Sequence, residues 1–255
     1  MALTVEPVAC LKDNYAWLVH DSESALTAIV DPSEPEPVRR AVGARRFGLT
    51  HILNTHHHFD HTGGNIPLKQ EFGAVIVGPD RDRDRIPGID VGVREGAPWR
   101  FGRHTVRILE IPAHTRGHIA FVFDEEKIAF TGDTLFAMGC GRLFEGTAEM
   151  MWNSLSKLLL LADDVRIFCG HEYTLNNGRF ALTLEPGNAD LVMRQREVEI
   201  LRAKGLPSVP SAMGLEKRTN PFLRPHSAEI RRSLGMERAG DVDVFAEMRR
   251  RKDSF

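Results

Sequence analysis

Apolar residues recur along this chain in short runs separated by polar, turn-forming segments, a pattern typical of mixed α/β proteins. Residues 16–21 and 25–32 are rich in Val, Ile and Leu, and only three residues separate them, which predicts a two-stranded hairpin. Residues 36–46 follow, with valines spaced four apart and arginines between them, as on one face of a helix. The apolar run 49–56 predicts a buried strand that ends in a cluster of histidines.

The alternation of strands and helices continues through the middle of the chain. Residues 80–88 are dominated by Asp and Arg, and we expect a solvated surface loop there. Thr147 is expected to cap the helix that follows it. The predicted elements are helix 63–73, strand 74–79, strand 104–114, hairpin 119–136, helix 147–162 and strand 165–172.

After about residue 173 the sequence shows helical patterns and no further strand patterns. Residues 188–205 open on an asparagine cap and close on a glycine, which marks a helix well. Two shorter helical pieces are expected near 227–234 and 243–252, and a proline-containing loop over 206–225. No strand pattern is visible here, so we expect an α/β domain over residues 1–172 and a small all-helical domain over residues 173–255.

Composition narrows the functional classes. The chain has 255 residues, 42% hydrophobic and 27% charged, which is enough to bury a core of normal size. A formal net charge of −2 argues against general binding of nucleic acid or anionic membranes. We see no signal peptide or membrane span, and Cys10, Cys140 and Cys169 form no disulfide pattern. We therefore expect a cytoplasmic protein, and we expect it to be a monomer.

The candidate chemistry is concentrated in the segment "THHHFDH" and at the ends of later predicted strands. Imidazole and carboxylate groups suit divalent ions such as zinc, iron or manganese. One catalytic zinc typically takes about three protein ligands, so seven candidates indicate two ions sharing a bridge. Asp133 is the natural bridge because a carboxylate has two oxygens. The candidates are His56, His58, Asp60, His61, His114, Asp133 and His171.

These motifs give the chain a family resemblance. "THHHFDH" resembles the HxHxDH signature of the metallo-β-lactamase superfamily, and "PAHTRGH", "FTGDTLF" and "CGHEY" follow in the same order as in that superfamily. Within it the chain resembles the hydroxyacylglutathione hydrolases, or glyoxalase II. "GDTLFAMGCGRLFEGTAEMM", "CGHEYTLNNGRFA", "EKRTNPFLR" and the terminal "RRRKDSF" carry that resemblance over essentially the whole chain.

The resemblance implies an αββα sandwich of the metallo-β-lactamase type followed by a small helical domain. It implies a first metal site of His56, His58 and His114. It implies a second metal site of Asp60, His61 and His171, with Asp133 shared between the two. His57 is left out, because at the end of a strand its side chain would point away from its neighbours.

The resemblance also implies a substrate. The expected reaction is hydrolysis of the thioester S-D-lactoylglutathione to glutathione and D-lactate, the second step of methylglyoxal detoxification, by a hydroxide that bridges the metals. Asp60 and Asp133 would be the catalytic carboxylates, and zinc is the first choice of metal. Phe144 stands where some family members have a tyrosine that contacts glutathione, so this polar contact is expected to be missing. The implied substrate-binding residues are Arg142, Tyr173, Arg249 and Lys252.

Three other functions compete with this interpretation. The main alternative is a glutathione persulfide dioxygenase with a single iron, a related family that should lack the full helical C-terminal domain. A phosphodiesterase acting on RNA ends would need a more basic surface than a net charge of −2 indicates. A binding domain with a dead site would lack at least one metal ligand, and here none is missing.

Overall fold

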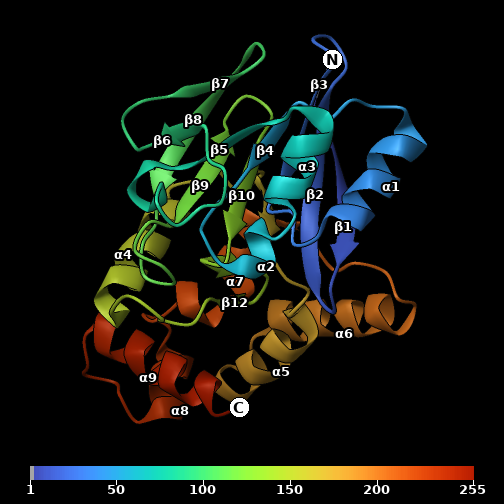
Figure 1. Ribbon diagram of the computed structural model, residues 1–255. Coiled ribbons are helices and arrows are strands. Elements are labelled where there is room, and N and C mark those ends of the chain that lie inside the picture. Colours follow the sequence, from blue (N-terminus) through green and yellow to red (C-terminus); the bar gives the residue numbers. More distant parts are fainter. Residues whose placement is uncertain (1–2) are drawn as a thin grey trace.

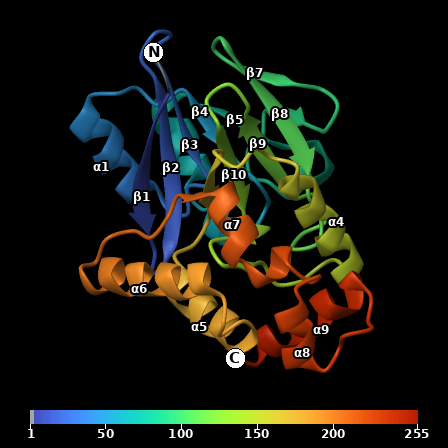
Figure 2. The ribbon, with the colours of Figure 1, turned by 180° about the vertical axis from the view of Figure 1, so that it is seen from behind.

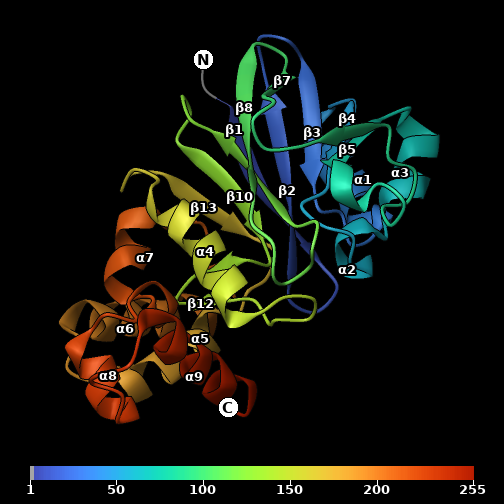
Figure 3. The ribbon, with the colours of Figure 1, turned by 90° about the vertical axis from the view of Figure 1, so that its left-hand side faces the viewer.

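Two six-stranded sheets packed face to face form the body of the protein (Figures 1 and 3). The computed structural model describes residues 3–255. In the first sheet, β1 to β3 are antiparallel neighbours, whereas β3 to β6 run parallel. Its strands, in spatial order, are β1 (Thr4–Cys10), β2 (Asn14–Asp21), β3 (Leu26–Val30), β4 (His51–Leu53), β5 (Val75–Pro79) and β6 (Val91–Val93).

The second sheet is antiparallel except where β10 and β13 run side by side in the same direction. A short ribbon of β11 (Leu135–Phe136) and β12 (Gly139–Cys140) follows β10. The strands of the second sheet, in spatial order, are β14 (Ser211–Ala212), β13 (Arg166–Cys169), β10 (Ile128–Gly132), β9 (Ile119–Phe123), β8 (His104–Glu110) and β7 (Trp99–Phe101).

Helices cover the outer faces of both sheets, and Figure 3 shows the resulting αββα layers. The helices α1 (Pro35–Arg45), α2 (Phe59–Thr62) and α3 (Asn65–Phe72) lie beside the first sheet, and α4 (Ala148–Leu159) lies beside the second. Thr147 caps α4 as expected, because its side chain accepts a hydrogen bond from the Met150 N–H. The αββα sandwich predicted from the sequence is confirmed.

Apolar side chains fill each interface between these layers. The faces of the two sheets that meet bury large aromatic residues, including Trp17, Phe121 and Phe168. Under α1, Val38 and Val42 pack on the outer face of the first sheet. Strands such as β2 and β3 are buried on both faces, so they read in the sequence as continuous apolar runs, whereas β8 alternates buried and exposed residues.

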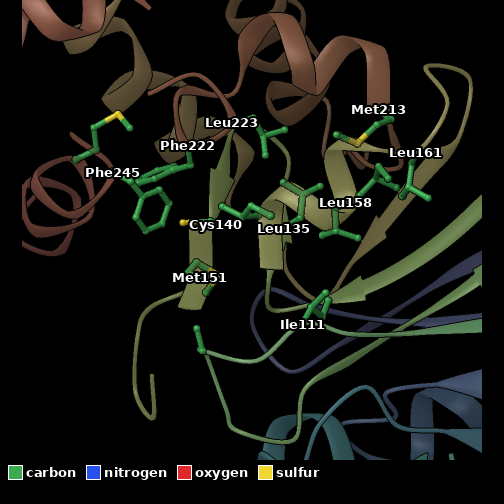
Figure 4. Packing of buried hydrophobic residues seen from close by; sticks show 14 of the residues in the cluster. Ile111, Leu135, Cys140, Met151, Leu158, Leu161, Met213, Phe222, Leu223 and Phe245 are labelled. Carbon is green, nitrogen blue, oxygen red and sulfur yellow. The ribbon is translucent and has the colours of Figure 1, made fainter. Parts of the chain in front are cut away.

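The C-terminal helices gather below the sandwich in the views of Figures 1 and 2. Their apolar faces share a core with α4 and the β11–β12 ribbon, where Phe222 and Phe245 pack near Leu135, Cys140 and Met151 (Figure 4). This shared core fixes the helices against the sheet end. The helices are α5 (Thr174–Leu184), α6 (Ala189–Ala203), α7 (Met213–Thr219), α8 (Ala228–Leu234) and α9 (Asp241–Asp253).

Three elements of the C-terminal region differ from the sequence prediction. Helix α5 was not expected, and α7 lies inside the segment 206–225 that was expected to be a loop. Residues Ser211 and Ala212 form β14, which pairs with β13 and extends the second sheet. A strand of two residues leaves no periodicity to detect, so its position depends on the neighbouring edge of the sheet.

Candidate metal centre

The seven metal-ligand candidates come from five segments that meet at one end of the two sheets. The loop after β4 carries His56 and His58, and α2 carries Asp60 and His61. The remaining three follow β8, β10 and β13, and they are His114, Asp133 and His171. The parallel pairing of β10 with β13 places the ends of these strands, and therefore their following residues, at the same edge.

Three imidazoles form the first cluster. His58 Nδ1 lies 3.1 Å from His56 Nε2 and 3.1 Å from His114 Nε2. The ligand atoms of the three residues all lie within 4.8 Å of one another. His56 and His114 are buried, and His58 is partly exposed towards a cavity. The structure therefore brings together the trio that the family resemblance implies for the first site.

The second cluster contains one carboxylate and two imidazoles. Asp60 Oδ2 lies 3.7 Å from His61 Nε2 and 3.5 Å from His171 Nε2. Asn14 holds this carboxylate, because its side-chain amide donates to Asp60 Oδ2 and to the Asp60 carbonyl, both at 3.1 Å. The ligand atoms of these three residues also lie within 4.8 Å of one another.

Asp133 lies between the two clusters. Its Oδ2 is 3.5 Å from His114 Nε2 and 3.2 Å from His171 Nε2, and its Oδ1 is 3.4 Å from His61 Nε2. One carboxylate thus faces an imidazole of the first cluster and two of the second. This is the arrangement expected of a group shared by two metal ions.

The donor set fits divalent metal ions. Within residues 3–255, the buried atoms His61 Nε2 and Asp133 Oδ1 have no hydrogen-bond partner, although such atoms are nearly always satisfied in folded proteins. Burial holds the pKa of His56 well below its usual range and lowers the pKa of His58 to about 4, so both rings are neutral. Neutral imidazole is the form that binds a metal.

Charge at the second cluster is balanced within the protein. Burial alone would raise the pKa of the Asp133 carboxyl, but the neighbouring His171 and His61 hold it well below its usual range. Burial alone would lower the pKa of His61, and Asp133 and Asp31 instead raise it. The carboxylates of Asp133 and Asp31 thus favour positive charge at this position, as expected of a site that binds a cation.

Several residues that orient the cluster were not found by sequence reasoning. Asp31 Oδ2 accepts from His61 Nδ1 at 3.1 Å, and both of its oxygens also accept from Thr55. Asp13 Oδ1 accepts from His171 Nδ1 at 2.9 Å. His118 Nε2 accepts from the Asp133 N–H at 3.0 Å. Such partners fix the ring orientation of metal-binding histidines, but they have no characteristic spacing in a sequence.

A cavity of about 560 Å³ connects the metal cluster to the C-terminal helices. His58, Asp60, His114, Asp133 and His171 line one side of it. The four residues that the resemblance implies for substrate binding, Arg142, Tyr173, Arg249 and Lys252, also line it. The cavity therefore joins a metal-binding wall to a wall rich in cations.

The four implied substrate residues differ in their exposure and in the contacts that they already make within the protein. The Arg142 side chain is largely exposed, and the Tyr173 ring stacks on His171 with centroids 4.6 Å apart. Lys252 Nζ lies 5.2 Å from the ring centroid of Phe255. Arg249 is only 5% exposed, and its guanidinium already donates to the Cys140 carbonyl at 2.8 Å and pairs with Asp253 at 2.9 Å.

Phe144 forms an aromatic edge above the first cluster. Its ring centroid lies 5.7 Å from that of His58 and 5.1 Å from that of His114, and the residue is 61% exposed. It lines the same cavity, so it offers apolar contact and no hydrogen bond to a molecule bound there.

His57 lies outside the metal cluster. Its Nδ1 is 2.9 Å from Asp82 Oδ2, and its Nε2 is 2.5 Å from Arg85 Nη2. Neither partner belongs to the groups that could hold a metal. Both ring nitrogens of His57 therefore bind partners outside the metal cluster, although the edge of the ring still packs against His58 with centroids 4.9 Å apart.

The chain is similar to known proteins over nearly its whole length. Residues 12–171 match the model of the metallo-beta-lactamase superfamily, and residues 172–255 match the model described as hydroxyacylglutathione hydrolase C-terminus. The chain is 52% identical over 253 residues to a hydroxyacylglutathione hydrolase of Methylococcus capsulatus, covering 99% of each chain. It is 50% identical over 254 residues to the same enzyme of Rhizobium meliloti, covering 100% of this chain and 99% of the other.

Solved structures share the fold. ETHE1 from Myxococcus xanthus superposes with a TM-score of 0.69 at 23% identity, covering 98% of this chain and 90% of that one. The di-iron-bound form of TTHA1623 superposes with a TM-score of 0.63 at 26% identity, covering 86% of this chain and 100% of that one. None of the helices within residues 3–255 combines the length and the hydropathy that a membrane-spanning segment requires.

Proposed function

The chain belongs to the hydroxyacylglutathione hydrolase family of the metallo-beta-lactamase superfamily, and on that premise we propose that it hydrolyses S-D-lactoylglutathione to glutathione and D-lactate. The observation that carries the proposal is the cavity in which metal-ligand candidates face a group of cations. A thioester of glutathione needs both. Its reacting carbonyl must be polarised by a Lewis acid, and its two carboxylates must be matched by positive charge. This reaction would be the second step of methylglyoxal detoxification.

Two functional units support this activity. We propose residues 1–172 as the metal-binding catalytic domain and residues 173–255 as the domain that binds the glutathione half of the substrate. The second unit supplies Tyr173, Arg249 and Lys252 to the cavity, while the first supplies the candidate metal ligands and Arg142. The two units share an apolar core, which supports a fixed position of the cation-rich wall of the cavity relative to its metal-binding wall.

The protein binds divalent metal ions, and we propose that these are two zinc ions, with iron or manganese as alternatives. His56, His58 and His114 would hold the first ion, Asp60, His61 and His171 the second, and Asp133 both. Metal ions bound there would generate a nucleophile from water at neutral pH and polarise the thioester carbonyl.

The residues around the metals set the geometry of the reaction. Asn14 orients Asp60, Asp31 orients His61 and Asp13 orients His171, each through a hydrogen bond of 2.9–3.1 Å. The partly exposed Asp60 carboxylate faces the cavity, where it could also accept a proton from water. Thiolate is a good leaving group, so the chain needs no strong general acid beside the sulfur.

We propose that glutathione is held mainly by charge. The Lys252 ammonium and the Arg142 guanidinium offer donors to the substrate carboxylates, and the Tyr173 hydroxyl offers a further hydrogen bond. Arg249 adds positive charge from within the cavity wall. Phe144 adds an apolar edge above His58 and His114, in place of the tyrosine of some family members.

The other proposals concern the cellular setting. We propose a cytoplasmic protein that acts as a monomer and binds neither nucleic acid nor membranes. Support comes from a formal net charge of −2 and from three free, buried cysteines. Burial raises the pKa of Cys140 to about 11, which suits an inert buried thiol and not a nucleophile.

The substrate proposal is tested with purified protein and four substrates. We expect S-D-lactoylglutathione to be hydrolysed, as measured by loss of thioester absorbance and by release of free thiol. Glutathione persulfide with oxygen, a bis-aryl phosphodiester and a β-lactam are the comparison substrates, and we expect them to react far more slowly. If glutathione persulfide reacts faster than S-D-lactoylglutathione, the thioester hydrolase proposal is wrong and the dioxygenase alternative takes its place.

Replacing Lys252 with alanine is expected to raise KM by about tenfold and to change kcat by less than about twofold, because the lost charge-assisted contact is remote from the reacting carbon. Steady-state kinetics with S-D-lactoylglutathione measures both constants. Lys204→Ala is the matched control, since this exposed lysine lies outside the cavity lining. An unchanged KM in Lys252→Ala would remove Lys252 from the substrate site.

The same lysine predicts a pH dependence. Partial burial, together with Arg249 and Arg142, lowers the pKa of Lys252 from 10.5 to about 8. The ammonium is charged below this pH and attracts the substrate carboxylates, so kcat/KM is expected to fall as the pH rises through about 8. The Lys252→Ala variant should lack this inflection. If the pH profiles of kcat/KM have the same shape for the unmodified protein and for Lys252→Ala, the assignment of this inflection to Lys252 is wrong.

A further inference from the structure

A polar bridge outside the metal cluster joins the histidine-bearing loop to the loop of residues 141–147, which we call the substrate loop. The bridge consists of Asp82, His57, Arg85 and Glu145, in that order. His57 lies between two metal-ligand candidates in the sequence, and Glu145 lies within the substrate loop. The bridge therefore connects two functional segments that are far apart along the chain.

The directions of the hydrogen bonds in the bridge follow from the chemistry of its members. A guanidinium group has no acceptor, so Arg85 Nη2 donates to His57 Nε2 across 2.5 Å. His57 must then carry its proton on Nδ1, which donates to Asp82 Oδ2 at 2.9 Å. Asp82 is itself buried against Gly117, where a Cβ atom would come within 2.3 Å of the carboxyl carbon. His57 is thus fixed in one tautomer and one orientation.

Glu145 closes the bridge with a fork of two contacts. Arg85 Nη2 donates to its Oε1 at 2.5 Å, and Arg85 Nη1 donates to its Oε2 at 3.0 Å. The Arg116 N–H donates to Oε2 at 2.8 Å, which ties Glu145 to the segment that carries His114. Arg85 holds the pKa of Glu145 at about 2, so the pair is fully charged at neutral pH. Planar, two-pronged pairs of this kind restrict geometry as well as adding binding energy.

The substrate loop is held at both ends, and its functional side chains lie between the two anchors. At one end, the Arg142 carbonyl accepts from His114 Nδ1 at 2.9 Å. At the other end, Glu145 is held by the bridge. Phe144 lies directly before Glu145 and stands over His58 and His114, while the Arg142 side chain is exposed in the cavity.

We propose that Arg85 and Glu145 are positioning residues for substrate binding, which fix the substrate loop so that Phe144 and Arg142 face the bound thioester. This proposal rests on the proposed function, since it concerns the same cavity. Glu145 lies outside the lining of that cavity, so it acts through its neighbours and not by contact with substrate. Without the bridge, ordering the loop would be a cost of each binding event.

Glu145→Gln and Arg85→Met, singly and together, test the proposal. Each single variant is expected to raise KM, and the dissociation constant of the product glutathione, by about fivefold, within the range of coupling seen for paired charges. The double variant should resemble the single variants, because the second substitution removes a partner that has already lost its contact. Metal content and kcat should change little.

Two controls come from the same surface. Glu149→Gln removes a nearby exposed carboxylate that the bridge does not use, and Arg81→Met removes an exposed arginine beside Asp82. Both should leave KM within about twofold of the unmodified protein, as expected for surface positions. Hydrogen exchange of the amides in residues 141–147 gives a second measurement, and only the bridge variants should exchange faster there.

The outcomes separate this proposal from the proposed function. If the unmodified protein hydrolyses S-D-lactoylglutathione and the bridge variants keep its KM and its exchange rates, the positioning role is wrong. A fivefold rise in KM in each single variant that multiplies in the double variant would also overturn it, because the residues would then act independently. If the unmodified protein does not hydrolyse the thioester, the proposed function fails, and hydrogen exchange still tests the bridge.

Discussion

Replacing Asp133 with alanine is expected to lower kcat/KM for S-D-lactoylglutathione by about 1,000-fold or more, as when a central electrostatic group is lost from an active site. The Asp133 carboxylate faces one imidazole of the first cluster and two of the second, at 3.2–3.5 Å. Its removal would leave His61 and His114 without their shared anion. Metal analysis after dialysis should therefore show fewer than two ions per chain, and kinetics should show a loss in kcat.

Two variants control for disruption of the fold. Asp133→Asn keeps the size of the side chain and one oxygen, so it should fold normally and still lose most activity. Asp84→Ala removes an exposed carboxylate from the loop before β6 and should change neither metal content nor rate. Near-normal turnover by Asp133→Ala with two metals still bound would contradict the assignment of Asp133.

Replacing Arg249 with alanine is expected to lower the free energy of unfolding by about 2–3 kcal/mol, the usual range for hydrogen bonds to a charged group with added loss of packing. Arg249 donates to the Cys140 carbonyl, pairs with Asp253 and lies 5.1 Å from the ring centroid of Phe222. These contacts join α9 to the β11–β12 ribbon, whose chain continues into the substrate loop. KM should therefore rise together with the loss of stability.

Arg250 is the matched control for Arg249. It occupies the next position of α9, its side chain is 69% exposed, and within residues 3–255 its ion pair is with Glu247 on the same helix. Surface pairs of this kind contribute about 0–1 kcal/mol, so Arg250→Ala should have a small effect. Urea unfolding curves and steady-state kinetics measure the two variants. Equal unfolding midpoints for Arg249→Ala and Arg250→Ala would show that Arg249 does not brace the helix.

The sequence predicts the central strands of the sandwich because they are apolar runs, whereas it gave no prediction of β1, β6 and β7 at the sheet edges. The hairpin expected over 16–21 and 25–32 is present as β2 and β3, and the expected hairpin over 119–136 contains β9 and β10. The cap of α6 is also as predicted, since the Asn188 side chain accepts from the Leu191 N–H. These features depend on local periodicity and capping, which a single sequence records.

Elements that depend on neighbours are less predictable. The strand expected over 104–114 ends at Glu110, and the chain then turns so that His114 can reach His58. The ribbon of β11 and β12 is held from outside, because Asn220 donates to the carbonyls of Phe136 and Gly139. Tertiary contacts of this kind decide short strands and bends, and propensity does not.

Some residues of the candidate site can be predicted from the sequence, and others can be recognised only in the folded chain. The dense segment of residues 56–61 reveals four of the metal-ligand candidates in the sequence, because few other uses require such clustering. The other three, His114, Asp133 and His171, are single residues at predicted strand ends and were found with the help of the family motifs. Asp31, Asp13 and His118 orient those residues through hydrogen bonds, and no spacing in the sequence assigns them this role, so only the folded chain shows it. Arg249 lines the cavity as expected, and the folded chain adds that its guanidinium also binds the Cys140 carbonyl and Asp253.

The most direct test of a two-metal thioester hydrolase is activity measured against metal content. Protein stripped with a chelator would be reloaded in steps with zinc, iron or manganese, and hydrolysis of S-D-lactoylglutathione would be measured at each step. If two metal ions share Asp133, the rate should reach its plateau at about two ions per chain. Full activity with one ion per chain, or no hydrolysis with two ions bound, would contradict this account.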